Sequence, residues 1–121
     1  MTMAAKPAWL APVVITASHW LRQELRQVEQ HAGCEFEFTS SIPDGRTNTR
    51  RRPIVILGAD LVSRLRKPIS CGGFVVVAAL DVAGPRTFSH AARISASYVI
   101  ALPNAREWLV DKLLDPGRHT P

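Results

Sequence analysis

The sequence has 121 residues, which fits a single domain that can bury roughly two-thirds of its unfolded surface. Hydrophobic residues make up 46% and charged residues 21%, a globular composition that excludes an intrinsically disordered chain. The uncharged stretch at 69–80 is too short to span a bilayer, the N-terminus lacks the basic start of a signal peptide, and two cysteines are too few for a disulfide framework. We therefore expect a cytoplasmic protein with no membrane span.

The positive charge lies in the middle of the chain. The formal net charge is +5, and the segment 39–67 alone accounts for that excess, since its seven basic residues face only Asp44 and Asp60. The remainder of the chain holds equal numbers of basic and acidic residues. The basic residues of the segment are Arg46, Arg50, Arg51, Arg52, Arg64, Arg66 and Lys67.

The first part of the chain predicts a strand, a helix and a second strand. The β-branched run at 12–16 is typical of a buried strand. Ser18 is the expected N-cap of a helix that ends at Gly33. The apolar residues of that helix recur at helical spacing, at Leu21, Leu25, Val28 and Ala32. Acidic and aromatic residues alternate at 34–38, which indicates a strand with one solvated face near a sheet edge, and the polar residues 39–52 predict a loop.

The second half predicts three more strands, each followed by a helix. Strands are expected at 53–58, 74–79 and 98–101, and helices at 59–66, at 85–95, and from an Asn104 cap with Glu107 three residues on. Apolar strands that alternate with helices indicate a parallel sheet covered on both faces. We predict a three-layer α/β fold of the flavodoxin-like, doubly wound type, with five parallel strands in the order 2-1-3-4-5.

A domain at 12–115 is thus expected between an N-terminal extension at 1–11 and a C-terminal tail at 116–121.

In a doubly wound sheet, binding and catalysis are found at the edge where the strands have their carboxyl ends. The residues that end these strands or follow them include Thr16, Gly58, Ala79, Leu102 and Pro103.

The order and spacing of these elements resemble a response-regulator receiver, the CheY-like domain. The resemblance implies an acidic pair after the first strand that holds Mg²⁺, a phosphoacceptor aspartate ending the third, a hydroxyl after the fourth, and Lys-Pro after the fifth. Here Thr16 stands where the acids belong and Gly58 at the phosphoacceptor position. Ala79 lies near the hydroxyl position, Leu102 replaces the lysine, and only Pro103 is retained. We expect a degenerate phosphorylation pocket with no catalytic residue, no metal and no cofactor, in a protein that is not an enzyme.

Several apolar segments resemble, more specifically, the receiver-like N-terminal domain of bacterial septum site-determining proteins, which are similar to the pilus-assembly proteins CpaE and TadZ. These segments are 13–16 with 21–25, then 54–57, 96–103 and 107–110. In that family the domain precedes a ParA/MinD-like ATPase domain. The chain contains no G-x-x-x-x-G-K-[ST] motif, so an ATP-dependent role would need an ATPase outside these residues.

Two features are candidate interaction sites. Arg50, Arg51 and Arg52 could hold the phosphates of a nucleic acid or of an anionic lipid, and the alternative is a solvated loop that the fold does not need. Trp108 could anchor a protein partner or a second copy of the chain, and the alternative is a core residue at helical spacing.

Three weaker patterns favour structural roles. Asp60 is expected to stabilise a helix N-terminus through the helix dipole rather than to act in the pocket. His31 and Cys34 have a metal-like spacing but are two ligands short of a structural zinc site. Ser18 and His19 lack a third group that would make them a catalytic triad.

The sequence therefore predicts a non-catalytic pseudo-receiver for protein–protein recognition, which regulates or localises a ParA/MinD-like ATPase in septum-site or pilus positioning. A homodimer is a further expectation, because receivers commonly associate through the side formed by their fourth and fifth strands and the adjacent helices. The alternative is a small basic nucleic-acid-binding protein that uses the segment Arg46–Lys67. Salt distinguishes the two, because phosphate binding weakens steeply as salt rises.

Overall fold

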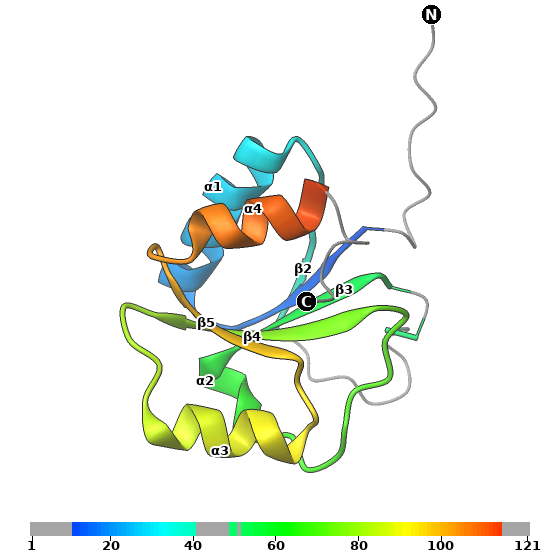
Figure 1. Cartoon of the computed structure of the whole chain (residues 1–121), viewed down its shortest axis with the longest axis vertical. Helices are drawn as coiled ribbons and strands as arrows, with labels where there is room; N and C mark the ends of the chain where they lie inside the picture. The colour runs from blue at the N-terminus through cyan, green and yellow to red at the C-terminus, as the bar shows by residue number, and fades with distance from the viewer. Residues whose placement is uncertain (1–10, 41–48, 51, 115–121) are drawn as a thin grey trace, which may run out of the picture.

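The computed structural model describes residues 11–40, 49, 50 and 52–114, and shows one parallel sheet with helices on both faces (Figure 1). The five strands are β1 (Val13–Ile15), β2 (Glu37–Thr39), β3 (Ile54–Gly58), β4 (Phe74–Leu80) and β5 (Tyr98–Leu102). All neighbouring strands are parallel, and their order is β2-β1-β3-β4-β5. The predicted flavodoxin-like order is confirmed, and β2 lies at an edge of the sheet as its alternating sequence indicated.

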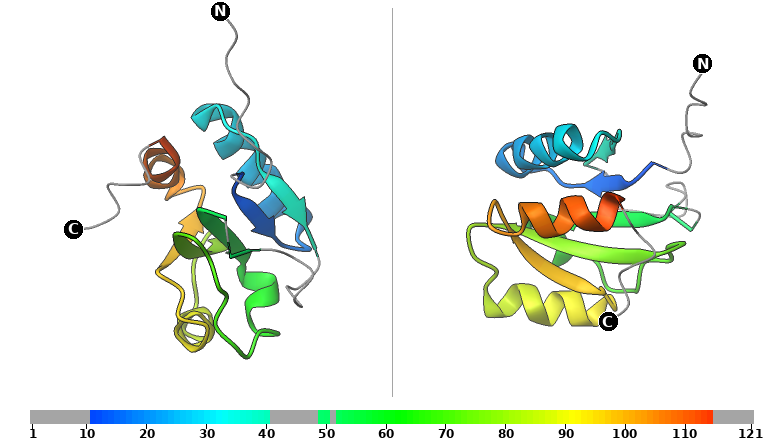
Figure 2. Two further views of the ribbon diagram at one scale, coloured as in Figure 1. Left: turned by 90° about the vertical axis from the view of Figure 1, so that its right-hand side faces the viewer. Right: turned by 45° about the horizontal axis from the view of Figure 1, so that its top comes forward.

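Four helices form the outer layers of the fold. They are α1 (His19–Ala32), α2 (Ala59–Val62), α3 (Pro85–Arg93) and α4 (Arg106–Leu114). Helices α1 and α4 cover one face of the sheet, and α2 and α3 cover the other (Figures 1 and 2). Because each face of a covered parallel sheet must bury apolar side chains, β3 is buried along its whole length and β4 along all but its last residue.

Two hydrophobic cores result, one on each side of the sheet. Under α1 and α4, Leu25 and Leu109 pack with alternate residues of the strands, among them Val76. Under α2 and α3, Leu61 and Ile94 pack with the residues that point the other way. The two-residue period of the strands therefore divides one run of apolar residues between two separate cores.

Helix α1 has the ends that its sequence predicts. The Ser18 hydroxyl oxygen accepts a hydrogen bond from the Leu21 N–H at 3.2 Å, which satisfies one of the free N–H groups of the first turn. Gly33 ends the helix with a φ of 68°, a left-handed conformation that glycine adopts without a Cβ clash.

Several element boundaries differ from the prediction, among them those of α2, β2 and α4. Helix α2 ends at Val62 rather than at residue 66, and Leu65 reaches the same core as Leu61 from a non-helical segment. Strand β2 starts at Glu37, later than the alternation suggested. Helix α4 begins at Arg106, so Asn104 lies in the preceding turn and not at the N-cap.

Parts of the predicted domain organisation lie outside the described residues, namely the extension at 1–11 apart from Ala11 and the tail at 116–121. Among the residues that the structure does describe, no helix has the length and apolar character that crossing a bilayer requires.

Candidate functional site

The carboxyl edge of the sheet brings the ends of β1 and β3 together. Ile15 of β1 pairs with Leu57 of β3, so the next residues along these two parallel strands, Thr16 and Gly58, lie side by side. Thr16 is fully buried although its side chain is polar. A buried hydroxyl needs a hydrogen-bond partner, since leaving one unsatisfied costs about 1–3 kcal/mol.

Asp60 supplies that partner from the first turn of α2. The Thr16 hydroxyl donates to Oδ1 of Asp60 at 2.7 Å, and the Ala17 N–H donates to Oδ2 at 2.9 Å. The Thr16 hydroxyl oxygen in turn accepts from the Ser18 N–H at 3.0 Å. The carboxylate of Asp60 thus joins the end of β1 to the start of α2, and its role extends beyond the helix-dipole role that the sequence suggested.

Gly58 lies directly beneath this hydrogen-bonded pair. A Cβ at this position would collide with Oδ1 of Asp60 and would lie 2.6 Å from the Thr16 hydroxyl oxygen. The resemblance to a receiver places the phosphoacceptor aspartate at this position. In this chain any side chain at residue 58 must displace the bond between Thr16 and Asp60.

The other three residues of the predicted pocket do not add polar groups to this edge. Ala79 is buried and pairs with Ala101 of β5. Leu102 is fully buried in the core under α1 and α4, where it packs with Leu109. Pro103 follows it through a cis peptide bond and is exposed. The structure therefore brings Thr16 and Gly58 together with Asp60 at the carboxyl edge of the sheet, whereas Leu102 lies in the core.

The weaker sequence patterns have local structural roles. Ser18 caps α1, and the His19 ring lies edge-on to Trp20. His31 Nδ1 lies 2.8 Å from the carbonyl oxygen of Gln27, one turn back along the same helix. Within residues 11–40, 49, 50 and 52–114, no three His, Cys, Asp or Glu side chains come close enough together to hold a metal ion.

Cys71 lies in a niche made by the backbone before β4. Its thiol is 3.2 Å from the carbonyl oxygen of Arg52, and the Gly73 N–H donates to the sulfur at 3.4 Å. Burial raises the pKa of the Cys71 thiol, so the less nucleophilic protonated form is favoured. Gly73 directly precedes β4, and a Cβ there would collide with the carbonyl oxygen of Pro53.

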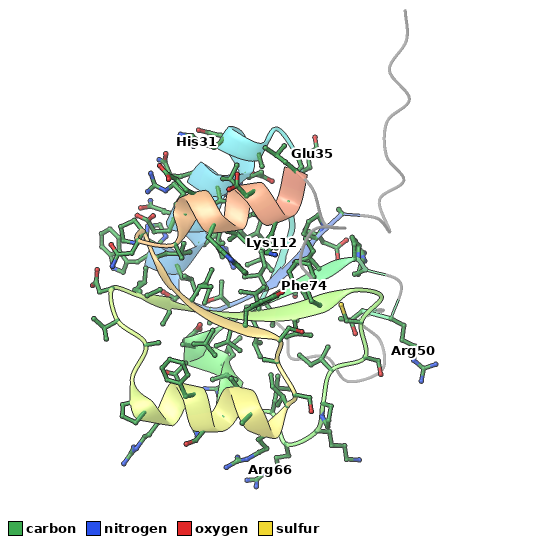
Figure 3. The ribbon with its side chains drawn as sticks, viewed as in Figure 1. His31, Glu35, Arg50, Arg66, Phe74 and Lys112 are labelled. Atoms are coloured by element: carbon green, nitrogen blue, oxygen red, sulfur yellow. The ribbon has the colours of Figure 1, made fainter. Side chains whose placement is uncertain are left out.

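The arginine cluster is not a uniform solvated loop. Arg50 is exposed and points away from the fold (Figure 3). Arg52 instead forms a salt bridge with Glu37 of β2 at 2.9 Å and donates to the carbonyl oxygen of Ala11 at 3.1 Å. Arg52 is therefore not a solvated side chain, and Arg51 lies outside the described residues.

Trp108 is half-buried, and its ring packs against the core under α1 and α4 and also lines a surface groove. The ring lies edge-on to Tyr98, with 4.8 Å between the centroids, and Lys112 Nζ lies 5.6 Å from both rings. An open groove of about 480 Å³ runs along the edge strand β5 beside α4, lined by Tyr98, Val99, Ile100, Ala101, Asn104, Ala105 and Trp108. Tyr98 was not among the predicted site residues, although it begins an apolar strand that the sequence did reveal.

A comparison with protein families agrees with this architecture. The model of a family described as the Rv3660c-like, CheY-like N-terminal domain matches residues 14–121, which is nearly the whole chain. The chain belongs to this family of CheY-like domains. No curated protein matches it. In this CheY-like domain, the groove at Tyr98 and Trp108 lies where β5 meets α4.

Proposed function

We propose that this CheY-like domain has lost phosphoryl-transfer chemistry and works by recognising another protein. The observation that carries the proposal is the packing at Gly58. The position that a receiver uses for its phosphoacceptor is occupied by the hydrogen bond between Thr16 and Asp60. Asp60 already accepts two hydrogen bonds, so its carboxylate is committed to holding the end of β1 against α2.

The proposed partner is a ParA/MinD-like ATPase that positions a septum or a pilus, with the groove beside β5 as the contact. Support comes from the resemblance to the N-terminal domains of septum site-determining, CpaE and TadZ proteins. The groove adds to it, because aromatic side chains such as Tyr98 and Trp108 supply much of the energy of protein interfaces. On this proposal the domain acts in the cytoplasm and needs no metal or cofactor of its own.

The loss of chemistry is tested by treating the purified chain with acetyl phosphate and Mg²⁺ and measuring its intact mass. We expect no adduct, whereas an aspartyl phosphate would add about 80 Da. A receiver that accepts phosphate, treated in parallel, shows that the reagent is active. An adduct in the parent chain that disappears in Asp60→Asn would contradict the proposal, because it would make Asp60 a phosphoacceptor.

Partner binding is tested by titrating the purified chain with the ParA/MinD-like ATPase of the same organism in a calorimeter. Trp108→Ala and Asn104→Glu change the groove, and we expect each to raise the Kd at least about tenfold. Truncation of a hot-spot tryptophan costs about 2 kcal/mol or more, and Asn104→Glu would bury an unpaired charge in the contact. Asn104 is exposed, so its substitution keeps the test valid if Trp108→Ala unfolds the chain. Trp20→Ala removes an exposed tryptophan from α1 and is the matched control.

Binding that is unchanged in both groove variants, or lost equally in the Trp20 control, would exclude the groove as the contact. Sedimentation velocity of the same variants tests the expected homodimer. If the parent is a dimer and Asn104→Glu is a monomer, the groove joins two copies of this chain and not the chain to an ATPase.

A further inference from the structure

Charge is distributed unevenly between the two helical layers of the fold. Helices α1 and α4 hold four basic and four acidic residues and are balanced. The residues 59–73 and 81–97, which contain α2 and α3, hold five basic residues and two acidic ones, Asp60 and Asp81. We call the five the basic face, and they are Arg64, Arg66, Lys67, Arg86 and Arg93.

The members of the basic face come from two segments that cover the same side of the sheet. Leu65, between Arg64 and Arg66, is buried in one core with Ala91 and Ile94 of the α3 region. Arg86 and Arg93 are seven residues apart on α3, and this spacing of nearly two turns places them on one side of the helix, with His90 between them. Figure 3 shows Arg66 pointing away from the sheet on the α3 side of the molecule.

These side chains are exposed and are not neutralised by the fold. All five have exposed side chains. The structure gives two salt bridges among the residues it describes, Arg52 with Glu37 and Arg106 with Glu24, and neither involves the basic face. The carboxylate of Asp60 is directed to Thr16 and Ala17. The basic face therefore has a net positive charge available to an anionic partner.

Two exposed apolar side chains accompany this charge. Phe88 on α3 is 54% exposed, and Val82 in the loop that leads into α3 is 77% exposed. A duplex nucleic acid offers phosphates to the arginines but no apolar medium for these two side chains. A lipid bilayer offers both, because basic residues meet its anionic headgroups while an aromatic ring enters the boundary with the acyl chains.

We infer that the basic face, together with Phe88 and Val82, is a docking surface for a membrane that contains anionic lipids. The surface belongs to helix and loop segments, as expected for a protein that lies on a bilayer without crossing it. Each basic residue near such a membrane strengthens binding about fivefold, so the five together give reversible, salt-sensitive attachment. The inference is independent of the protein-partner proposal, because the groove lies beside β5 and α4.

The test is co-sedimentation of the full chain with vesicles of phosphatidylcholine alone and with vesicles of equal parts phosphatidylcholine and phosphatidylglycerol. We expect binding to the anionic vesicles only. Arg86→Gln with Arg93→Gln should weaken it about 25-fold. The matched control, Arg26→Gln, removes one charge from an exposed position on α1 and should change binding less than about twofold, whereas Arg86→Gln alone should weaken it about fivefold.

Phe88→Ser keeps the charge and removes the aromatic ring, and it should weaken vesicle binding several-fold without changing the melting temperature. Duplex DNA is titrated in parallel with the same proteins. The inference is overturned if the parent does not bind anionic vesicles, if Arg26→Gln and Arg86→Gln lose binding equally, or if Phe88→Ser binds as the parent does. DNA binding that depends on Arg86 and Arg93, without vesicle binding, would assign the surface to nucleic acid instead.

Discussion

Gly58 and Asp60 show how the position of one acid determines its role at a strand end. A receiver, by resemblance, ends its third strand with an aspartate whose carboxylate is open to phosphate. Here the acid lies two residues later, on α2, and turns back to accept hydrogen bonds from Thr16 and Ala17. The vacated position is a glycine because the Thr16 and Asp60 side chains fill the space above its Cα. Asp60 therefore has a structural role at the carboxyl edge of the sheet.

The first prediction concerns this close packing. Gly58→Ala should destabilise the fold by about 1–3 kcal/mol, because its methyl group must push Asp60 or Thr16 aside. Gly84→Ala is the matched control, since both glycines precede a helix at its N-cap and a Cβ at Gly84 meets nothing within 4 Å. Urea unfolding gives both free energies. Equal losses in the two variants would show that Gly58 is required only as a cap.

The second prediction separates two neighbouring arginines. Arg52→Ala should lower the free energy of unfolding by about 1–2 kcal/mol, because a charged hydrogen bond to the Ala11 carbonyl and the Glu37 salt bridge are lost from a largely buried side chain. Arg50→Ala should change it by no more than about 0.5 kcal/mol, since that side chain is exposed. Thermal melts of the two variants beside the parent make the comparison. Equal stability of both would mean that the Arg52 contacts do not contribute.

At the scale of elements, local sequence patterns predicted the strands and their order, and they were less accurate for helix ends. The apolar runs that contain Val14, Val55 and Val76 are each long enough and β-branched enough to be strands in any context. Leu65 has helical spacing from Leu61 but reaches the core from a non-helical segment, so periodicity extended α2 too far.

The candidate site was predictable in its positions but not in its contacts. Strand ends placed Thr16 and Gly58 at the carboxyl edge, as the fold type requires. The bond between Thr16 and Asp60 joins residues 44 apart in sequence, and the groove joins Tyr98 to Trp108 across the turn from β5 to α4. Spacing along the chain does not specify such pairs, because they depend on how the elements pack in space.

The third prediction tests the central strand. Val76 has no exposed surface and lies in β4 between β3 and β5. Val76→Asp should prevent stable folding, because it would bury a charge that has no partner. Val82→Asp is the matched control at an exposed valine and should stay within about 0.5 kcal/mol of the parent. Circular dichroism at a fixed temperature distinguishes the two, and a folded Val76→Asp protein would contradict the assignment of β4.

At the scale of the whole molecule, one sheet separates two cores that contain different side chains of the same strands. Val76 belongs to the core under α1 and α4, while its neighbours Val75 and Val77 belong to the core under α2 and α3. Neither helical layer can lose its packing without exposing one face of β3 and β4. The fold should therefore unfold as one cooperative unit, as small single domains usually do.

The last prediction concerns the two hydrophobic cores on opposite faces of the sheet. Leu25→Ala opens a cavity in the core under α1, and Ile94→Ala opens one under α3, since both side chains are fully buried. Each should cost about 2–5 kcal/mol and lower the midpoint of a single transition. The double variant should lose the sum of the two within about 0.5 kcal/mol, because the side chains belong to different clusters with the sheet between them. Urea unfolding followed by circular dichroism measures all four proteins. Two separate transitions in either single variant would mean that the helical layers unfold independently, and a double variant far from additive would mean that the sheet transmits strain between its faces.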